Sequence, residues 1–80
     1  MKKLRVFFEP SFGKLAKKHE DGLEIILDEP VKMISLLKNM GIREWDYAFL
    51  TQNDLVISPE QEVSNGDTIT VFSMEEIAES

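Results

Sequence analysis

Carboxylates are the most abundant side chains in this sequence that could do acid–base chemistry. The 80 residues include 15 aspartates and glutamates, against 9 lysines and arginines and a single histidine. Two carboxylates act as general acid and general base only where a pocket holds them together with different pKa values. No segment of the sequence indicates such a pocket. We therefore expect no catalytic residues and a protein that is not an enzyme.

The other side chains that commonly carry chemistry are scarce. His19 lies in a polar run, and we predict that it is a solvated loop residue. The absence of cysteine excludes thiolate catalysis, disulfides and Cys-ligated metals. Phosphate-binding glycine motifs are absent too. We expect no cofactor and no metal site, although the glutamates near the end of the sequence could weakly hold a divalent cation (Glu75, Glu76 and Glu79).

The charge balance limits the classes of partner. A net charge of −6 and a pI near 4.6 disfavour binding to nucleic acid and to anionic membranes. A small lysine cluster could hold an acidic partner, but it is more typical of a solvated loop (Lys14, Lys17 and Lys18). The N-terminus does not resemble a signal peptide, and no apolar run is long enough to span a membrane. With no disulfide in so small a domain, we predict a cytoplasmic protein.

Alternating apolar and polar residues predict five strands. The sequence places them at residues 3–9, 23–27, 47–51, 55–57 and 68–72. Turn residues separate them at 52–54 and 65–67, where Gly66 supplies a positive φ. Residues 14–22 are rich in lysine and predict a long polar loop that closes the first hairpin.

One helix is predicted between the second and third strands. Asp28 is a candidate N-cap, and Pro30 fits the first turn. Apolar residues at helical spacing predict a buried stripe (Val31, Ile34, Leu36, Leu37 and Met40). Gly41 closes the helix, which we place from Pro30 to Met40.

The order of these elements predicts the fold class. If the last strand returns beside the first, the sheet is mixed and the helix crosses one of its faces. That is the β-grasp fold of ubiquitin-like proteins, although the order of elements does not by itself single it out. We predict an α+β domain over residues 1–72, with a mixed sheet of about five strands and one main helix packed on one face. Residues 73–80 form an acidic C-terminal tail.

Three sequence features, in the same order, carry a family resemblance. They are the opening strand Leu4–Phe8, the helix that starts at Glu29-Pro30-Val31 and ends at Met40-Gly41, and the Gly66-Asp67 turn into the last strand after the hairpin at 48–56. With these features the chain resembles the MoaD/ThiS family of β-grasp sulfur carriers in molybdopterin and thiamine biosynthesis. The resemblance covers residues 3–72. It implies a protein partner, either an activating (adenylating) enzyme or the large subunit of a synthase.

The end of the sequence departs from that family. Sulfur carriers end in Gly-Gly, which threads into enzyme active sites, whereas no glycine follows Gly66 here. Bulky Ile77 and the tail glutamates are poor substitutes. We therefore predict a non-catalytic protein-interaction module. The alternative is a sulfur carrier whose Gly-Gly is absent from this sequence.

Candidate binding residues follow from the strand alternation. Four apolar residues are predicted to lie on the sheet face away from the helix and to contact a partner (Phe7, Ile26, Phe49 and Phe72). A shift of the strand register by one residue would instead place them in the core. The tail offers three more candidates (Met74, Ile77 and Ser80). Gly66 and Asp67 are predicted to be structural turn residues, and Trp45 and Tyr47 either close one end of the core or anchor an interface.

Overall fold

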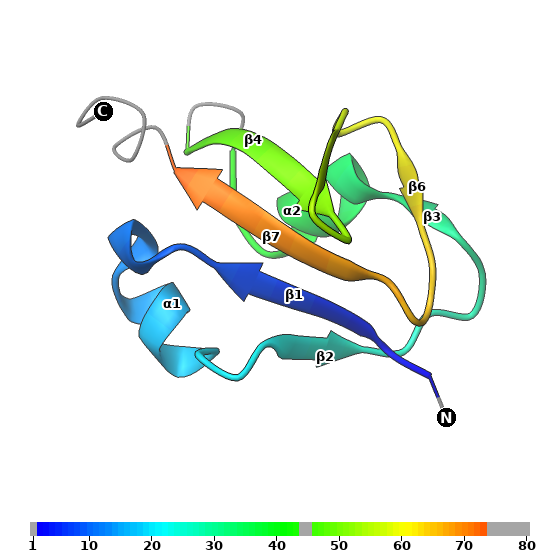
Figure 1. The fold of residues 1–80 in the computed structure, drawn as a ribbon, viewed down its shortest axis with the longest axis horizontal. Coiled ribbons are helices and arrows are strands. Elements are labelled where there is room, and N and C mark those ends of the chain that lie inside the picture. Colours follow the sequence, from blue (N-terminus) through cyan, green and yellow to red (C-terminus); the bar gives the residue numbers. More distant parts are fainter. Residues whose placement is uncertain (1, 44–45, 74–80) are drawn as a thin grey trace.

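The computed structural model describes residues 2–43 and 46–73. Five strands form one mixed sheet in the order β2-β1-β7-β4-β5 (Figure 1). They are β1 (Leu4–Phe8), β2 (Leu23–Ile25), β4 (Tyr47–Gln52), β5 (Leu55–Ile57) and β7 (Thr68–Ser73). β1 and β7 are parallel, and the other neighbours are antiparallel. The predicted α+β class, with a mixed five-stranded sheet, is confirmed.

The core lies between this sheet and helix α2 (Met33–Asn39), which passes behind the sheet in the view of Figure 1. Alternate residues of β1 and β7 are buried against the helix, because successive strand side chains point to opposite faces. In β4 the buried residues are Tyr47 and Leu50, since the register shifts between Tyr47 and Phe49. Met33 and Leu37 are the buried residues of the helix. The strands contribute Leu4, Val6, Phe8, Leu50, Ile69 and Val71.

The helix begins three residues later than the sequence predicts. Val31 and Lys32 form strand β3, which pairs with β6 (Glu62–Val63) in a small second sheet. Asp28 does not cap the helix: the N-cap is Lys32, with no side-chain cap. The first helical N–H groups instead donate to loop carbonyls, Met33 to Gln61 at 3.0 Å and Ile34 to Pro59 at 2.9 Å. A tertiary contact thus satisfies the donors for which Asp28 was proposed.

The predicted loop at 14–22 is also partly wrong. It contains the short helix α1 (Lys14–Lys18), which follows the 3-10 turn η1 (Pro10–Phe12). Phe12, Leu15 and Ala16 pack against the core, so a few apolar contacts outweigh the lysine-rich composition. The lysines remain exposed.

His19 is not the solvated loop residue that the sequence predicts. It follows α1 and is half-buried, with its ring centroid 6.2 Å from that of Phe8. The polar residues that flank His19 in the sequence do not indicate this contact with Phe8.

Two differences at strand ends affect predicted site or tail residues. β2 stops at Ile25, so Ile26 and Leu27 lie beyond it. β7 continues to Ser73, which therefore belongs to the sheet and not to the tail. The Ser73 hydroxyl is buried and hydrogen-bonds the Ser11 hydroxyl. No helix within the two described ranges is long and apolar enough to cross a membrane.

The turn before β7 has the expected backbone. Gly66 has φ +98°, and its N–H donates to the Lys3 carbonyl at 3.0 Å. A Cβ added at this position would lie 3.3 Å from Lys2 Cδ, which is a close but flexible neighbour. The constraint on this residue is therefore mainly conformational.

We expect Gly66→Val to lower the free energy of unfolding by about 2 kcal/mol, since a β-branched residue resists positive φ. Urea denaturation measures the change. Thr68→Val is the matched control: it exchanges one β-branched residue for another at an exposed strand position and should change stability by less than about 0.5 kcal/mol. Equal effects of the two substitutions would contradict the argument from φ.

Candidate functional site

The sheet face away from α2 is largely uncharged. Cross-strand pairs place Phe7, Thr70, Thr51 and Val56 in one row across it, and Phe72 and Phe49 in the next. Arg5 and Glu24 are the only charged residues in these five strands, and they pair with each other at 3.4 Å. This face, which we call the open face, therefore carries almost none of the charge of a chain with a net charge of −6.

Three phenylalanines form an apolar patch on the open face, which we call the phenylalanine patch (Phe7, Phe49 and Phe72). The rings of Phe49 and Phe72 stack in parallel, with centroids 4.5 Å apart and an interplanar angle of 9°. Such a pair contributes about 0.5–1.5 kcal/mol beyond its area burial. Phe7 lies diagonally beside Phe72 on the neighbouring strand. All three side chains are half-buried, so each keeps part of its ring in contact with solvent.

Gly22 makes room for Phe7 at the edge of the patch. It has φ +94°, and a Cβ there would lie 2.6 Å from Arg5 Cγ and 3.1 Å from Phe7 Cζ. The side chains of Arg5 and Phe7 thus occupy the space that a side chain at position 22 would need, so this position requires glycine. In the sequence, Asp21-Gly22 indicates only a turn, so this close approach was missed.

The structure does not bring Ile26 to the other three predicted residues. Continuing the antiparallel register of β1 and β2 places Ile26 beside Lys3, four residues along β1 from Phe7. At strand spacing that is about 13 Å. The Arg5–Glu24 pair lies between them, so Ile26, which is 57% exposed, stands alone.

Val56 and Leu55 are apolar surface residues that the sequence argument did not single out. They lie on β5 with 70% and 73% of their surface exposed. The sequence identified the strand but not its place at the edge of the sheet. Edge position depends on which strands pair, and local periodicity carries no information about that.

The turn residues Gly66 and Asp67 belong to a hydrogen-bonded clamp at one end of the sheet. Asp67 Oδ2 accepts from Gln52 Nε2 and from Ser64 N, both at 2.9 Å. Asn65 pairs with Leu27 like a short strand, accepting from its N–H and donating to its carbonyl, both at 2.9 Å. These contacts account for the turn residues structurally.

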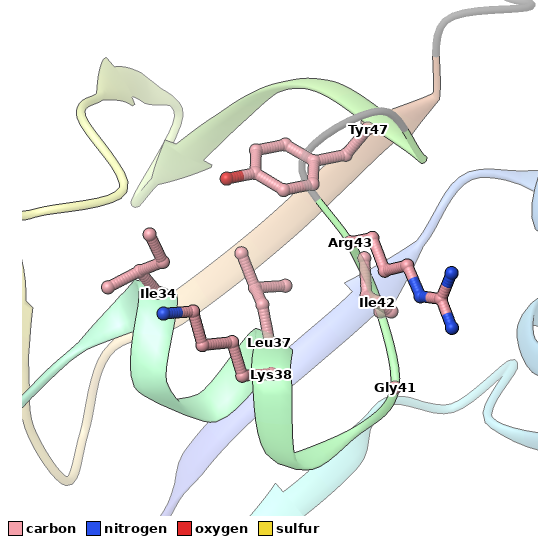
Figure 2. A pocket seen from close by; sticks show the side chains of 7 residues that line it. All are labelled: Ile34, Leu37, Lys38, Gly41, Ile42, Arg43 and Tyr47. Carbon is pink, nitrogen blue, oxygen red and sulfur yellow. The ribbon is translucent and has the colours of Figure 1, made fainter.

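A separate open pocket of about 470 Å³ lies between α2 and the start of β4 (Figure 2). Leu37, Ile42 and Tyr47 supply buried apolar surface, and Tyr47 thus helps to close one end of the core. In Figure 2 the Lys38 side chain extends toward Ile34, while the Arg43 guanidinium points away from the pocket.

The side chains that line the described part of this pocket are suited to binding. Its described lining offers a phenol, an amine and a guanidinium, but no carboxylate, imidazole or thiol. A general acid–base pair or a nucleophile with its base therefore cannot be assembled from these residues. Across residues 2–43 and 46–73, no group of three or more potential metal ligands occurs either.

Several predicted residues lie elsewhere. The lysine cluster (Lys14, Lys17 and Lys18) is exposed on α1. Seven further candidates lie outside the described residues: Trp45, the tail residues Met74, Ile77 and Ser80, and the glutamates Glu75, Glu76 and Glu79.

Comparison with protein-family models, with curated proteins and with solved structures finds no match.

Proposed function

We propose that this chain is a β-grasp docking module that resembles the MoaD/ThiS proteins and binds a protein partner through its open face. The observation that carries the proposal is the phenylalanine patch on a face nearly free of charge. Interface centres are depleted in charged residues and enriched in aromatic ones. The order of strands and the position of α2 support the β-grasp assignment.

The make-up of the open face also limits the partner. Threonines surround the patch (Thr51, Thr68 and Thr70). At its end Glu24 Oε2 pairs with Arg5 at 3.4 Å and with Lys3 at 3.6 Å, so this cluster carries one net positive charge. A partner with a strongly charged surface would lose hydration over the phenylalanine patch without gaining an ion pair there. We infer a folded protein with a flat, uncharged apolar surface. By resemblance, an adenylating enzyme or a synthase large subunit is the class to test first.

The test begins with capture of a partner by the wild-type chain from its native cell extract. The partner is then purified, and its affinity is measured for the wild type and for Phe7→Asp. A carboxylate in the patch would be desolvated on binding, so we expect the dissociation constant to rise about tenfold or more. Far-UV circular dichroism checks that the variant is folded, and Phe72→Asp provides a second variant if it is not.

Ile26→Asp is the matched control, because it adds the same charge at an exposed apolar residue outside the patch. It should leave the affinity within about twofold of the wild type. A partner that binds folded Phe7→Asp and Phe72→Asp as tightly as the wild type would rule out docking through the open face. A partner that is lost only with Ile26→Asp would move the site to the other end of the sheet.

A further inference from the structure

The strongest feature left unexplained is the outer edge of β5. Leu55 and Val56 are the most exposed large hydrophobic residues within the described chain. β5 ends the sheet, and no lysine or arginine lies between Gln52 and Val63. Sheet edges in monomeric proteins are commonly protected by charged side chains, above all lysine. The nearby charged residues, Asp54 and Glu60, flank β5, and none of its own three residues is charged. An exposed apolar edge of this kind is suited to pairing with another strand.

The hairpin fixes which backbone groups of β5 face outward. Asn53 and Asp54 form its two-residue turn, with φ of 51° and 71°. In such a turn the flanking residues, Gln52 and Leu55, form a hydrogen-bonded pair, and the pairs then alternate. Leu55 and Ile57 therefore direct their N–H and C=O groups toward β4. Val56, between them, directs both groups away from the sheet.

We propose that the partner of this edge is β5 of a second copy of the chain, paired antiparallel about a two-fold axis at Val56. Each Val56 then donates its N–H to the carbonyl of the other Val56. On the open face the two Val56 side chains become cross-strand neighbours. On the opposite face Leu55 of each copy packs on Ile57 of the other, so the pairing covers both exposed residues.

Charge is compatible with this arrangement. The register that pairs Val56 with Val56 sets Asp54 of each copy opposite Ser58 of the other, so the two Asp54 carboxylates lie at opposite ends of the paired segment. A parallel arrangement in register would place Asp54 beside Asp54, which is unfavourable because like charges repel. The antiparallel pair avoids that contact and satisfies the symmetry of a closed dimer.

The paired segment is short, and this sets the strength of the dimer. The Ser58 carbonyl already accepts from Gln61 N at 2.9 Å, and Pro59 has no N–H to donate. Pairing is therefore confined to the residues around Val56. An interface of this size belongs to the weak class, and we expect a dissociation constant between about 10 μM and 1 mM.

The first test uses a single cysteine as a reporter of register, since the chain has none of its own. In a hydrogen-bonded antiparallel pair the Cα atoms are about 5.5 Å apart, which suits a disulfide. Val56→Cys should form a disulfide-linked dimer under mild oxidation at least tenfold faster than Leu55→Cys, because the two Leu55 positions are offset. Equal rates, or faster coupling through Leu55→Cys, would overturn the proposed register.

The second test is sedimentation equilibrium up to about 1 mM protein. Val56→Lys and Val56→Glu should each be monomeric, and an equimolar mixture should regain the dimer through opposite charges at the axis. Ile26→Lys, at the other edge of the sheet, should dimerise like the wild type. A wild type that stays monomeric, or a Val56→Lys variant that dimerises equally well, would refute self-pairing. This test needs only the chain itself, so its outcome is independent of the proposed docking through the open face.

Discussion

Leu50→Ala should lower the free energy of unfolding by about 3 kcal/mol. Leu50 is fully buried in β4, between Val71 of β7 and Ile57 of β5. Truncation removes apolar contacts on both sides and leaves a cavity that the surrounding strands fill only in part. An 80-residue domain has a small core, so this loss is a large share of its total stability. Urea denaturation monitored by circular dichroism gives the change in free energy.

Leu55→Ala is the control for this prediction, because it makes the same change on the neighbouring strand β5, at a side chain that is 73% exposed. In dilute solution, where pairing through β5 does not contribute, it should cost less than about 0.5 kcal/mol. If Leu50→Ala were as mild as Leu55→Ala, the register of β4 would be wrong by one residue. The open face and the core would then exchange places.

Local patterns predict the central strands well for a physical reason. In β1 and β7, every second residue is apolar and buried. The alternation of apolar residues in the sequence therefore matches the alternation of side chains between the two faces of the sheet. The same alternation predicted that Phe7 and Phe72 share the face away from the helix. The structure places both there, and their role in binding stays a prediction.

The elements that were predicted wrongly depend on contacts between distant segments. The start of α2 is set by the carbonyls of Pro59 and Gln61, nearly 30 residues away in the chain, and by pairing of β3 with β6. α1 forms because Leu15 and Ala16 reach the core, despite lysine-rich surroundings. Sequence patterns for helix caps and turns involve only neighbouring residues, so they cannot predict contacts of this kind.

The site shows the same limit. The order of strands determines that Gly22 lies against Phe7 and that Val56 lies on an unpaired edge of the sheet. Asn65 lies in a predicted turn, yet its side chain pairs with the backbone of Leu27, 38 residues earlier. The sequence could identify these residue types as turn or strand formers, but not the neighbours they meet.

The Asp67 carboxylate is the centre of a clamp between segments that are distant in the sequence. It joins the end of β4, through Gln52, to the segment that leads into β7, through Ser64. Hydrogen bonds to a charged group contribute about 1.5–3 kcal/mol each, and removing the acceptor leaves half-buried donors to be satisfied by water. Asp67→Ala should therefore cost about 2 kcal/mol in urea denaturation.

Asp28→Ala should have little effect on stability. The sequence predicts Asp28 as the helix cap, whose loss would cost about 1 kcal/mol. In the structure it is exposed, and the helix begins at Met33 with its first N–H groups bound by loop carbonyls, so the substitution should change stability by less than about 0.5 kcal/mol. A larger loss with Asp28→Ala than with Asp67→Ala would mean that the local cap, and not the clamp between distant segments, holds this end of the domain together.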